Sequence, residues 1–313
     1  MEITKIPADD ILTEKVWGGV FFHPLFVDTA REIFNLAGES LFIEKGGDPV
    51  CAVNLLVRNH SIARSAAIPL LFQYYGVIFF QKDLRPEVMR RIEAHIAEKC
   101  DYAMFSFPPD FHHEALSGGG WELGKQITLA LRNDDLHAWG RDFRDDVKNK
   151  IRKARKESVQ IEEVDAAPDD LWARAYQRRR LVPPVAPSIL RQWCQRLSAG
   201  SLLKIFVAKI DGSPVAFRGE LIHGDFAYDW IAGSSPEFHA TGSNQLLMAE
   251  IGSRLIETGI RTWDLVGGSV KSIRDFKKSF GAQDYIHYHG KICFNLKGKL
   301  FSILRKIKYG LQS

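Results

Sequence analysis

The stretch LLKIFVAKIDGSPVAFRGELIHGDFAYDWIAG, residues 202–233, decides the fold more than any other part of the chain. Its apolar runs are interrupted twice, by Asp211-Gly212 and by His223-Gly224-Asp225. Short Asp/Gly segments between apolar runs are typical of tight hairpin turns. The stretch therefore predicts three consecutive antiparallel strands.

Further helices and strands are predicted on both sides of this stretch. A helix is predicted over residues 243–259, and it is expected to end at Gly259 because glycine is a helix stop signal. A strand over 261–268, a short helix over 272–281 and a closing strand over 285–294 follow, and helices over 169–179 and 187–197 precede the three strands.

The first part of the chain also alternates between strand and helix patterns. A hairpin over 41–59 is predicted from its Gly-Gly turn, and an amphipathic helix over 85–100 from Val88, Ile92 and Ile96. Further strands are expected over 70–80, 102–109 and 120–132. The pattern breaks at residues 133–137, which predicts an N-terminal half, 1–135, and a C-terminal half, 136–313.

Composition narrows the class of protein. A formal net charge of +4 is too small to indicate a nucleic-acid partner by itself. The apolar run over 66–80 is too short for a membrane span, and the N-terminus shows no export signal. The 4 cysteines are scattered without metal-ligand spacing, so reduced thiols, no metal site and a cytoplasmic location are expected.

Two basic segments are candidates for contact with a binding partner. The helix expected over 139–157 has an apolar stripe, and its other faces carry Lys148, Arg152 and Arg155. The tail over 297–311 is also basic and amphipathic. Such segments are either solvated faces or contacts for tRNA phosphates or for the inner face of an anionic membrane, and the apolar stripe of the tail could instead dock on the N-terminal half.

Three blocks resemble the FemABX and BioF2-like group of the GNAT superfamily: RDFRDDVKNKIRKARKESVQI (141–161), VAKIDGSPVAFRGELIHGDFAYDWIAGSSPEF (207–238) and TWDLVGGSVKSIRDFKKSFGAQ (262–283). The third block is the most specific of them. The resemblance implies a mixed α/β fold of two tandem GNAT-like domains. It also implies transfer of an acyl or aminoacyl group to an amine, in relatives often from aminoacyl-tRNA to a peptidoglycan precursor.

The same resemblance implies catalytic residues. In relatives a Phe-Lys pair lies where donor and acceptor meet, and the matching positions here are Phe276 and Lys277. A lysine can hold a phosphate or stabilise a carbonyl oxygen under attack, although a solvated helix face is the simpler interpretation. Asp264, at a strand end, is the candidate that binds the acceptor amine and takes its proton.

Further residues are candidates for substrate binding. Asp229, Tyr228 and Arg274 belong to the same blocks, although strand alternation places Asp229 and Tyr228 on opposite faces. Arg218 and Glu220 share a face and are interpreted as an ion pair.

The turn before the helix over 243–259 is a candidate phosphate site. GNAT enzymes that use acetyl-CoA carry a Gln/Arg-x-x-Gly-x-Gly/Ala turn there, and its N–H groups bind the pyrophosphate. Here the turn contains Gly242, Ser243 and Asn244, preceded by His239, so the motif is incomplete and Ser243 could simply cap the helix.

Three functions stay open at this point. The first is aminoacyl or acyl transfer, by direct attack, to an amine of a cell-envelope, peptidoglycan or polysaccharide precursor. The second is acyl-CoA-dependent N-acylation of a nucleotide-linked aminosugar, and the third is a non-catalytic GNAT-like binding module. The donor is accordingly aminoacyl-tRNA or acyl-CoA, no cofactor is certain, and the oligomeric state is unknown.

Overall fold

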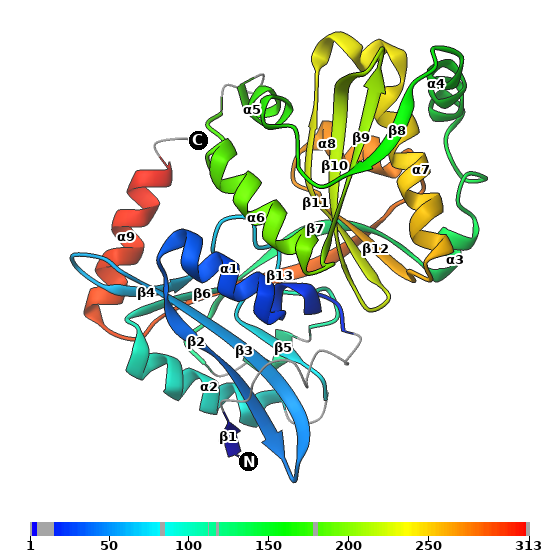
Figure 1. The fold of residues 1–313 in the computed structure, drawn as a ribbon. Coiled ribbons are helices and arrows are strands. Elements are labelled where there is room, and N and C mark those ends of the chain that lie inside the picture. Colours follow the sequence, from blue (N-terminus) through cyan, green and yellow to red (C-terminus); the bar gives the residue numbers. More distant parts are fainter. Residues whose placement is uncertain are drawn as a thin grey trace. The chain divides into compact units, whose positions relative to one another are not determined.

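The computed structural model describes residues 2–4, 16–81, 85–111, 113–116, 119–177 and 181–310. The chain divides into two compact units (Figure 1). The first consists of residues 1–126 together with 286–313, and the second consists of residues 127–285.

The second unit contains the strands predicted from residues 202–233. Its strands are β8 (Gln160–Val164), β9 (Leu203–Ile210), β10 (Ser213–His223), β11 (Phe226–Ser234) and β12 (Thr262–Gly267), together with the last residues of β7 (Glu122–Arg132). Its helices are α3 (Asn133–His137), α4 (Asp145–Lys156), α5 (Asp169–Gln177), α6 (Pro187–Ala199), η4 (Pro236–Thr241), α7 (Ser243–Glu257) and α8 (Lys271–Lys278).

These strands form a mixed sheet in the order β7-β12-β11-β10-β9-β8. All neighbours are antiparallel except β11 and β12, which are parallel because α7 lies between them in the chain. Figure 1 shows α5 and α6 on one side of β9–β11, and α4 and α7 on the other.

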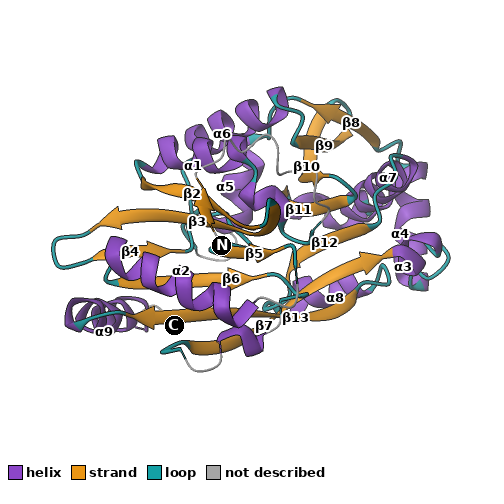
Figure 2. Ribbon diagram, turned by 90° about the horizontal axis from the view of Figure 1, so that it is seen from below, coloured by secondary structure: helices purple, strands orange, loops and turns teal. Residues whose placement is uncertain are grey.

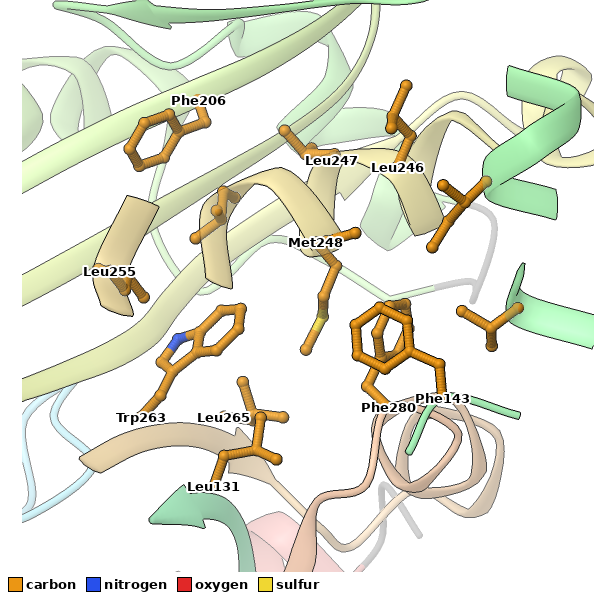
Figure 3. Close-up of a cluster of buried hydrophobic side chains, with 14 of the residues drawn as sticks. Leu131, Phe143, Phe206, Leu246, Leu247, Met248, Leu255, Trp263, Leu265 and Phe280 are labelled. Atoms are coloured by element: carbon orange, nitrogen blue, oxygen red, sulfur yellow. The ribbon is translucent and has the colours of Figure 1, made fainter. Parts of the chain in front are cut away.

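The hydrophobic core of this unit lies between α7, α4 and the sheet. Met248 of α7 points between Trp263 and Phe280 (Figure 3). The stripe predicted on the basic helix is buried here, since Phe143, Val147, Ile151 and Ala154 are at most 7% exposed. The amphipathic pattern therefore predicted correctly which face of α4 is inside.

The strands and helices of the first unit follow one another in an order related to that of the second unit. Its strands are β1 (Glu2–Thr4), β2 (Ala37–Lys45), β3 (Asp48–Asn59), β4 (Arg64–Ala67), β5 (Val77–Phe79), β6 (Tyr102–Phe107), the start of β7 and most of β13 (Gln283–Cys293). Its helices are η2 (Gly19–Phe22), α1 (Pro24–Phe34), α2 (Arg85–Lys99), η3 (His113–Leu116) and α9 (Leu296–Gly310). Figure 2 shows the strands of this unit flanked by α1 and α2.

The two units share a pattern of strand pairing. In the first, β2, β3 and β4 are antiparallel neighbours and β6 then pairs parallel to β4, as β12 pairs parallel to β11 in the second. The strand that completes each pattern comes from the other half of the chain: β13 pairs with β6, whereas the end of β7 pairs with β12. This repeated pattern is that of two GNAT-like folds in tandem.

The exchanged strands explain how the units differ from the predicted halves. The prediction placed the closing strand and the tail after it in the C-terminal half. In the structure residues 286–313 belong to the first unit, and the other boundary lies at 126/127, inside β7. A hydrophobic pattern identifies a strand but not its neighbour, so the exchange leaves no signal in the sequence.

Residues 70–80 also differ from the prediction. One buried strand was expected, but only Val77–Phe79 is extended and Tyr75 forms an isolated bridge with Ser106. Leu71 and Gly76 have positive φ angles, which interrupt any regular strand.

Among the described residues, no helix is both long and apolar enough to cross a membrane.

Candidate active site

A buried ion pair joins two neighbouring strands of the second unit. Nη1 of Arg218, on β10, donates to Oδ2 of Asp229, on β11, at 2.5 Å. Both side chains are at most 5% exposed. Two charges withdrawn from water are tolerated only when they are paired, so Asp229 and Arg218 depend on each other.

A β-bulge creates this pair. Gly219 is opposite Ile231 and Glu220 is opposite Asp229, so Trp230 is one extra residue in β11. In a regular ladder Glu220 would face Trp230, and Asp229 would point to the other face. The bulge therefore brings Asp229 to the face that carries Arg218. Because Arg218 forms its ion pair with Asp229, the predicted ion pair between Arg218 and Glu220 is wrong.

Lys277 reaches the same carboxylate from α8. Its Nζ lies 3.4 Å from Oδ2 of Asp229 and donates to the carbonyl oxygens of Leu265 and Val266. The residue is 6% exposed, so the interpretation of Lys277 as part of a solvated helix face is wrong. Burial lowers the pKa of the Lys277 amine below its ordinary value, and the negative charge of Asp229 opposes this change.

The amine of Lys277 lies where β11 and β12 separate. The two strands pair in parallel only from Phe226 to Tyr228 on β11, and the last paired residue on β12 is Asp264. Just beyond it, Val266 and Gly267 have φ angles of 59° and 45°. Two successive residues in this conformation turn the end of β12, which leaves the Leu265 and Val266 carbonyls to accept from Lys277.

Asp264 holds this turned strand end in place. Its Oδ1 accepts from the Val266 N–H at 2.8 Å and from Oγ1 of Thr128 at 2.6 Å. The residue is 0% exposed. These bonds place Asp264 under the backbone that binds Lys277, so the contacts are those of a positioning residue.

Glu220 is the second carboxyl group on the face of Arg218. Its Oε2 accepts from Nε1 of Trp263 at 2.8 Å, and the residue is 0% exposed. Burial raises the pKa of Glu220 to about 8, and the charge of Asp229 adds to the effect, while Arg218 opposes it. At neutral pH Glu220 is therefore mostly protonated, which leaves Asp229 as the charged partner of Arg218.

Arg218, Glu220, Asp229 and Lys277 form a buried cluster, and two other predicted residues border it. The guanidinium of Arg218 lies 5.5 Å from the centre of the Phe276 ring, within range of a cation–π contact. Its Nη2 lies 3.4 Å from Oδ1 of Asn244, the second residue of α7. The structure thus brings Phe276 and Asn244 to the same place as Lys277 and Asp229.

Other predicted residues lie apart from these contacts. Tyr228 is buried beside Phe226, and alternation puts it on the face opposite Asp229, as the sequence predicted. Arg274 binds Asp284 at the surface. Gly242, with a φ angle of 80°, is the N-cap of α7, so the interpretation of Ser243 as the cap is wrong.

The role of Gly242 is visible in its packing. A Cβ atom added there would lie 2.3 Å from the backbone oxygen of Lys150 on α4. The N–H of Ser243 is already bound to Oγ1 of Thr241. The close approach of α7 to α4 therefore accounts for this glycine.

The predicted basic residues of α4 lie on its exposed side. Nζ of Lys148 donates to the Arg141 carbonyl, and Arg155 forms an ion pair with Glu250 on α7 at 3.0 Å. Arg152 contacts Oδ1 of Asn149. These contacts are local to the surface of the unit.

Three residues that contribute to the cluster were not predicted from the sequence. Arg218 and Glu220 were noticed only as partners of each other, and Thr128 was not noticed at all. The available signal was the pair of charges inside the apolar run AFRGEL. A charge in a strand that is buried on both faces requires a buried partner.

Residues 141–278 match a family model described as an acetyltransferase (GNAT) domain. The C-terminal part of the chain therefore contains a GNAT domain. No curated protein matches this chain in sequence. The matched segment contains the whole cluster around Asp229 except Thr128.

Solved structures resemble this chain over nearly its whole length. A crystal structure of FemX aligns with a TM-score of 0.75 at 12% identity, covering 97% of this chain and 99% of that one. The C-terminal domain of a putative lysylphosphatidylglycerol synthetase from Agrobacterium fabrum aligns with a TM-score of 0.58 at 14% identity, covering 91% and 90%.

A tandem GNAT protein from the clavulanic acid biosynthesis pathway also aligns. Its TM-score is 0.56 at 13% identity, with 94% of this chain and 98% of that one covered. At these identities the structures establish a shared fold. The matched GNAT domain, together with this shared fold, supports an acyl- or aminoacyltransferase.

Proposed function

We propose that the second unit transfers an aminoacyl group onto an amine of a cell-envelope precursor, such as a peptidoglycan or polysaccharide intermediate, by direct attack within a complex of donor and acceptor. One observation carries this proposal: a buried lysine amine and a buried carboxylate meet at the point where β11 and β12 separate. Amine, carboxylate and adjacent backbone are the groups that acyl transfer to an amine requires.

Asp229 is assigned to the acceptor. An acceptor amine is protonated at neutral pH and must lose a proton before it attacks. Oδ1 of Asp229 is buried and has no hydrogen-bond partner among the described residues, whereas Oδ2 is engaged by Arg218 and Lys277. The unengaged oxygen can bind the ammonium group and take its proton.

Lys277 is assigned to the donor. When the amine attacks the acyl carbon, negative charge develops on the carbonyl oxygen, and the protonated Lys277 stabilises it in a site shielded from water. The adduct then collapses: the bond to the ester oxygen of the tRNA breaks, the second proton of the attacking nitrogen passes to that oxygen, which leaves as a hydroxyl group, and the acyl group remains on the acceptor nitrogen. Asp264 is assigned the role of holding the turned end of β12 under Lys277.

The choice of an aminoacyl donor rests on the relatives. The name of the putative lysylphosphatidylglycerol synthetase indicates a lysyl group, and FemX, which shares the fold, belongs to the group that the sequence resembles. Half-buried Lys148 and exposed Arg152 and Arg155 on α4 are then proposed to meet the phosphates of the donor. An acyl-CoA donor requires a pyrophosphate site near Gly242, where the N–H of Ser243 is already engaged.

A donor screen tests the proposal. The purified chain is incubated with charged tRNAs or acyl-CoAs and with amine-bearing precursors, and labelled product is counted. Transfer from aminoacyl-tRNA, lost in Lys277→Met and kept in Lys278→Met, is the expected result. Transfer from acyl-CoA alone would reject the donor assignment, and equal activity of the two variants would reject the site.

A further inference from the structure

The C-terminal helix α9 exposes an apolar face. Of the twelve large apolar side chains that are exposed in the described residues, five lie on this helix. They are Leu296, Leu300, Ile303, Leu304 and Ile307, and each is between 45% and 81% exposed. At 3.6 residues per turn they fall within an arc of about 100°.

The opposite face of α9 is the one that attaches the helix to the first unit. Phe301 packs against the rings of His60 and Tyr102. A Cβ atom at Gly298 would lie 1.9 Å from the Asp101 carbonyl oxygen, so the backbones touch there. The expected docking of the apolar stripe onto the N-terminal half is therefore wrong, because Phe301 and Gly298 make the contact and the stripe faces outward.

Basic residues border the apolar face on both sides. Lys297 follows one edge of the arc, and Lys299 and Lys306 follow the other. All three are exposed, and the sequence from Lys291 to Ser313 contains no Asp or Glu. Lysines beside an apolar stripe can keep their ammonium groups at the level of lipid headgroups while their aliphatic stems lie along the acyl chains.

We propose that α9 binds the surface of an anionic phospholipid bilayer, with its axis in the plane of the membrane and its apolar face in the acyl boundary. Charge complementarity selects this occupant. Two copies of the face would bring together lysines of equal sign with no acidic residue on either helix to pair with them, which disfavours a dimer through α9. An anionic surface attracts the same lysines.

Vesicle binding tests this proposal without any donor or acceptor, so its outcome is independent of the proposed function. The full chain is sedimented with vesicles of phosphatidylcholine alone or with phosphatidylglycerol added. We expect at least tenfold stronger binding to the anionic vesicles, and weaker binding as salt is raised. Ile303→Glu with Ile307→Glu should reduce binding at least tenfold.

A matched pair provides the control. Leu181→Glu with Val182→Glu makes the same change in charge at exposed apolar residues of the second unit and should leave vesicle binding unchanged. Thermal melts verify that both variants fold. Equal binding to both vesicle types, or full binding by the α9 variant, would overturn the proposal. So would a lipid-free dimer that the Ile303/Ile307 variant abolishes, because a second copy would then cover the face.

Discussion

Nζ of Lys277 lies 3.4 Å from Oδ2 of Asp229, and both side chains are at most 7% exposed. One belongs to a short helix and the other to a strand nearly fifty residues earlier, yet each is the buried counter-charge of the other. Arg218 shares the same carboxylate oxygen.

Replacing Lys277 by Met should abolish most of the transfer activity. Methionine is of similar length and fits an apolar site, but it cannot stabilise charge on the donor carbonyl, so kcat should fall by about 100- to 1000-fold. Lys278→Met is the control, because Lys278 is 42% exposed and binds Asp284. Initial rates at saturating donor measure both, and a fall of less than about tenfold for Lys277→Met would contradict the oxyanion role.

Replacing Asp229 by Asn should destabilise the fold. Arg218 and Lys277 would stay buried without a counter-charge, and breaking a buried pair in this way costs about 3–5 kcal/mol. Asp284→Asn removes a carboxylate that also binds two cations, Arg274 and Lys278, but at the surface, where about 0–1 kcal/mol is expected. Urea unfolding compares the two, and equal losses would mean that Asp229 is not a buried counter-charge.

Glu220 should make stability depend on pH. Its pKa is about 8 in the folded chain and lies near 4.5 when unfolded, so between these values the folded state holds the extra proton. The contribution of Glu220 is therefore complete below pH 4.5 and is lost as pH rises through 8. Glu220→Gln keeps an acceptor for Trp263 without titrating. The free energy of unfolding of the wild type relative to this variant should fall from pH 5 to 8, and parallel profiles would show that Glu220 is ionised when folded.

Two glycines with similar φ angles should respond differently to alanine. Gly242 and Gly259 have φ angles of 80° and 85°, so both variants pay for a left-handed alanine, about 1–2 kcal/mol. Only at Gly242 does the new Cβ also meet a backbone oxygen, that of Lys150, whereas nothing lies within 4 Å at Gly259. Thermal unfolding should place Gly242→Ala clearly below Gly259→Ala, and equal melting temperatures would contradict the packing of α7 on α4.

Most elements of the second unit could be predicted from the sequence. The turns at Asp211-Gly212 and His223-Gly224-Asp225 separate β9, β10 and β11, and the apolar stripe of α4 is buried as expected. These features are local, because turn chemistry and helical periodicity act over a few residues. Lys277 was also found, but through a resemblance and not through its burial.

The sequence by itself determined where strands and helices form and which faces of them are apolar. Tertiary structure decided which strands are neighbours: β13 completes the first unit and the end of β7 completes the second. It also decided the partner of Arg218, because one extra residue, Trp230, turns Asp229 to the other face of β11. Strand order and bulges arise from contacts between residues far apart in the chain, and neither periodicity nor turn residues record them.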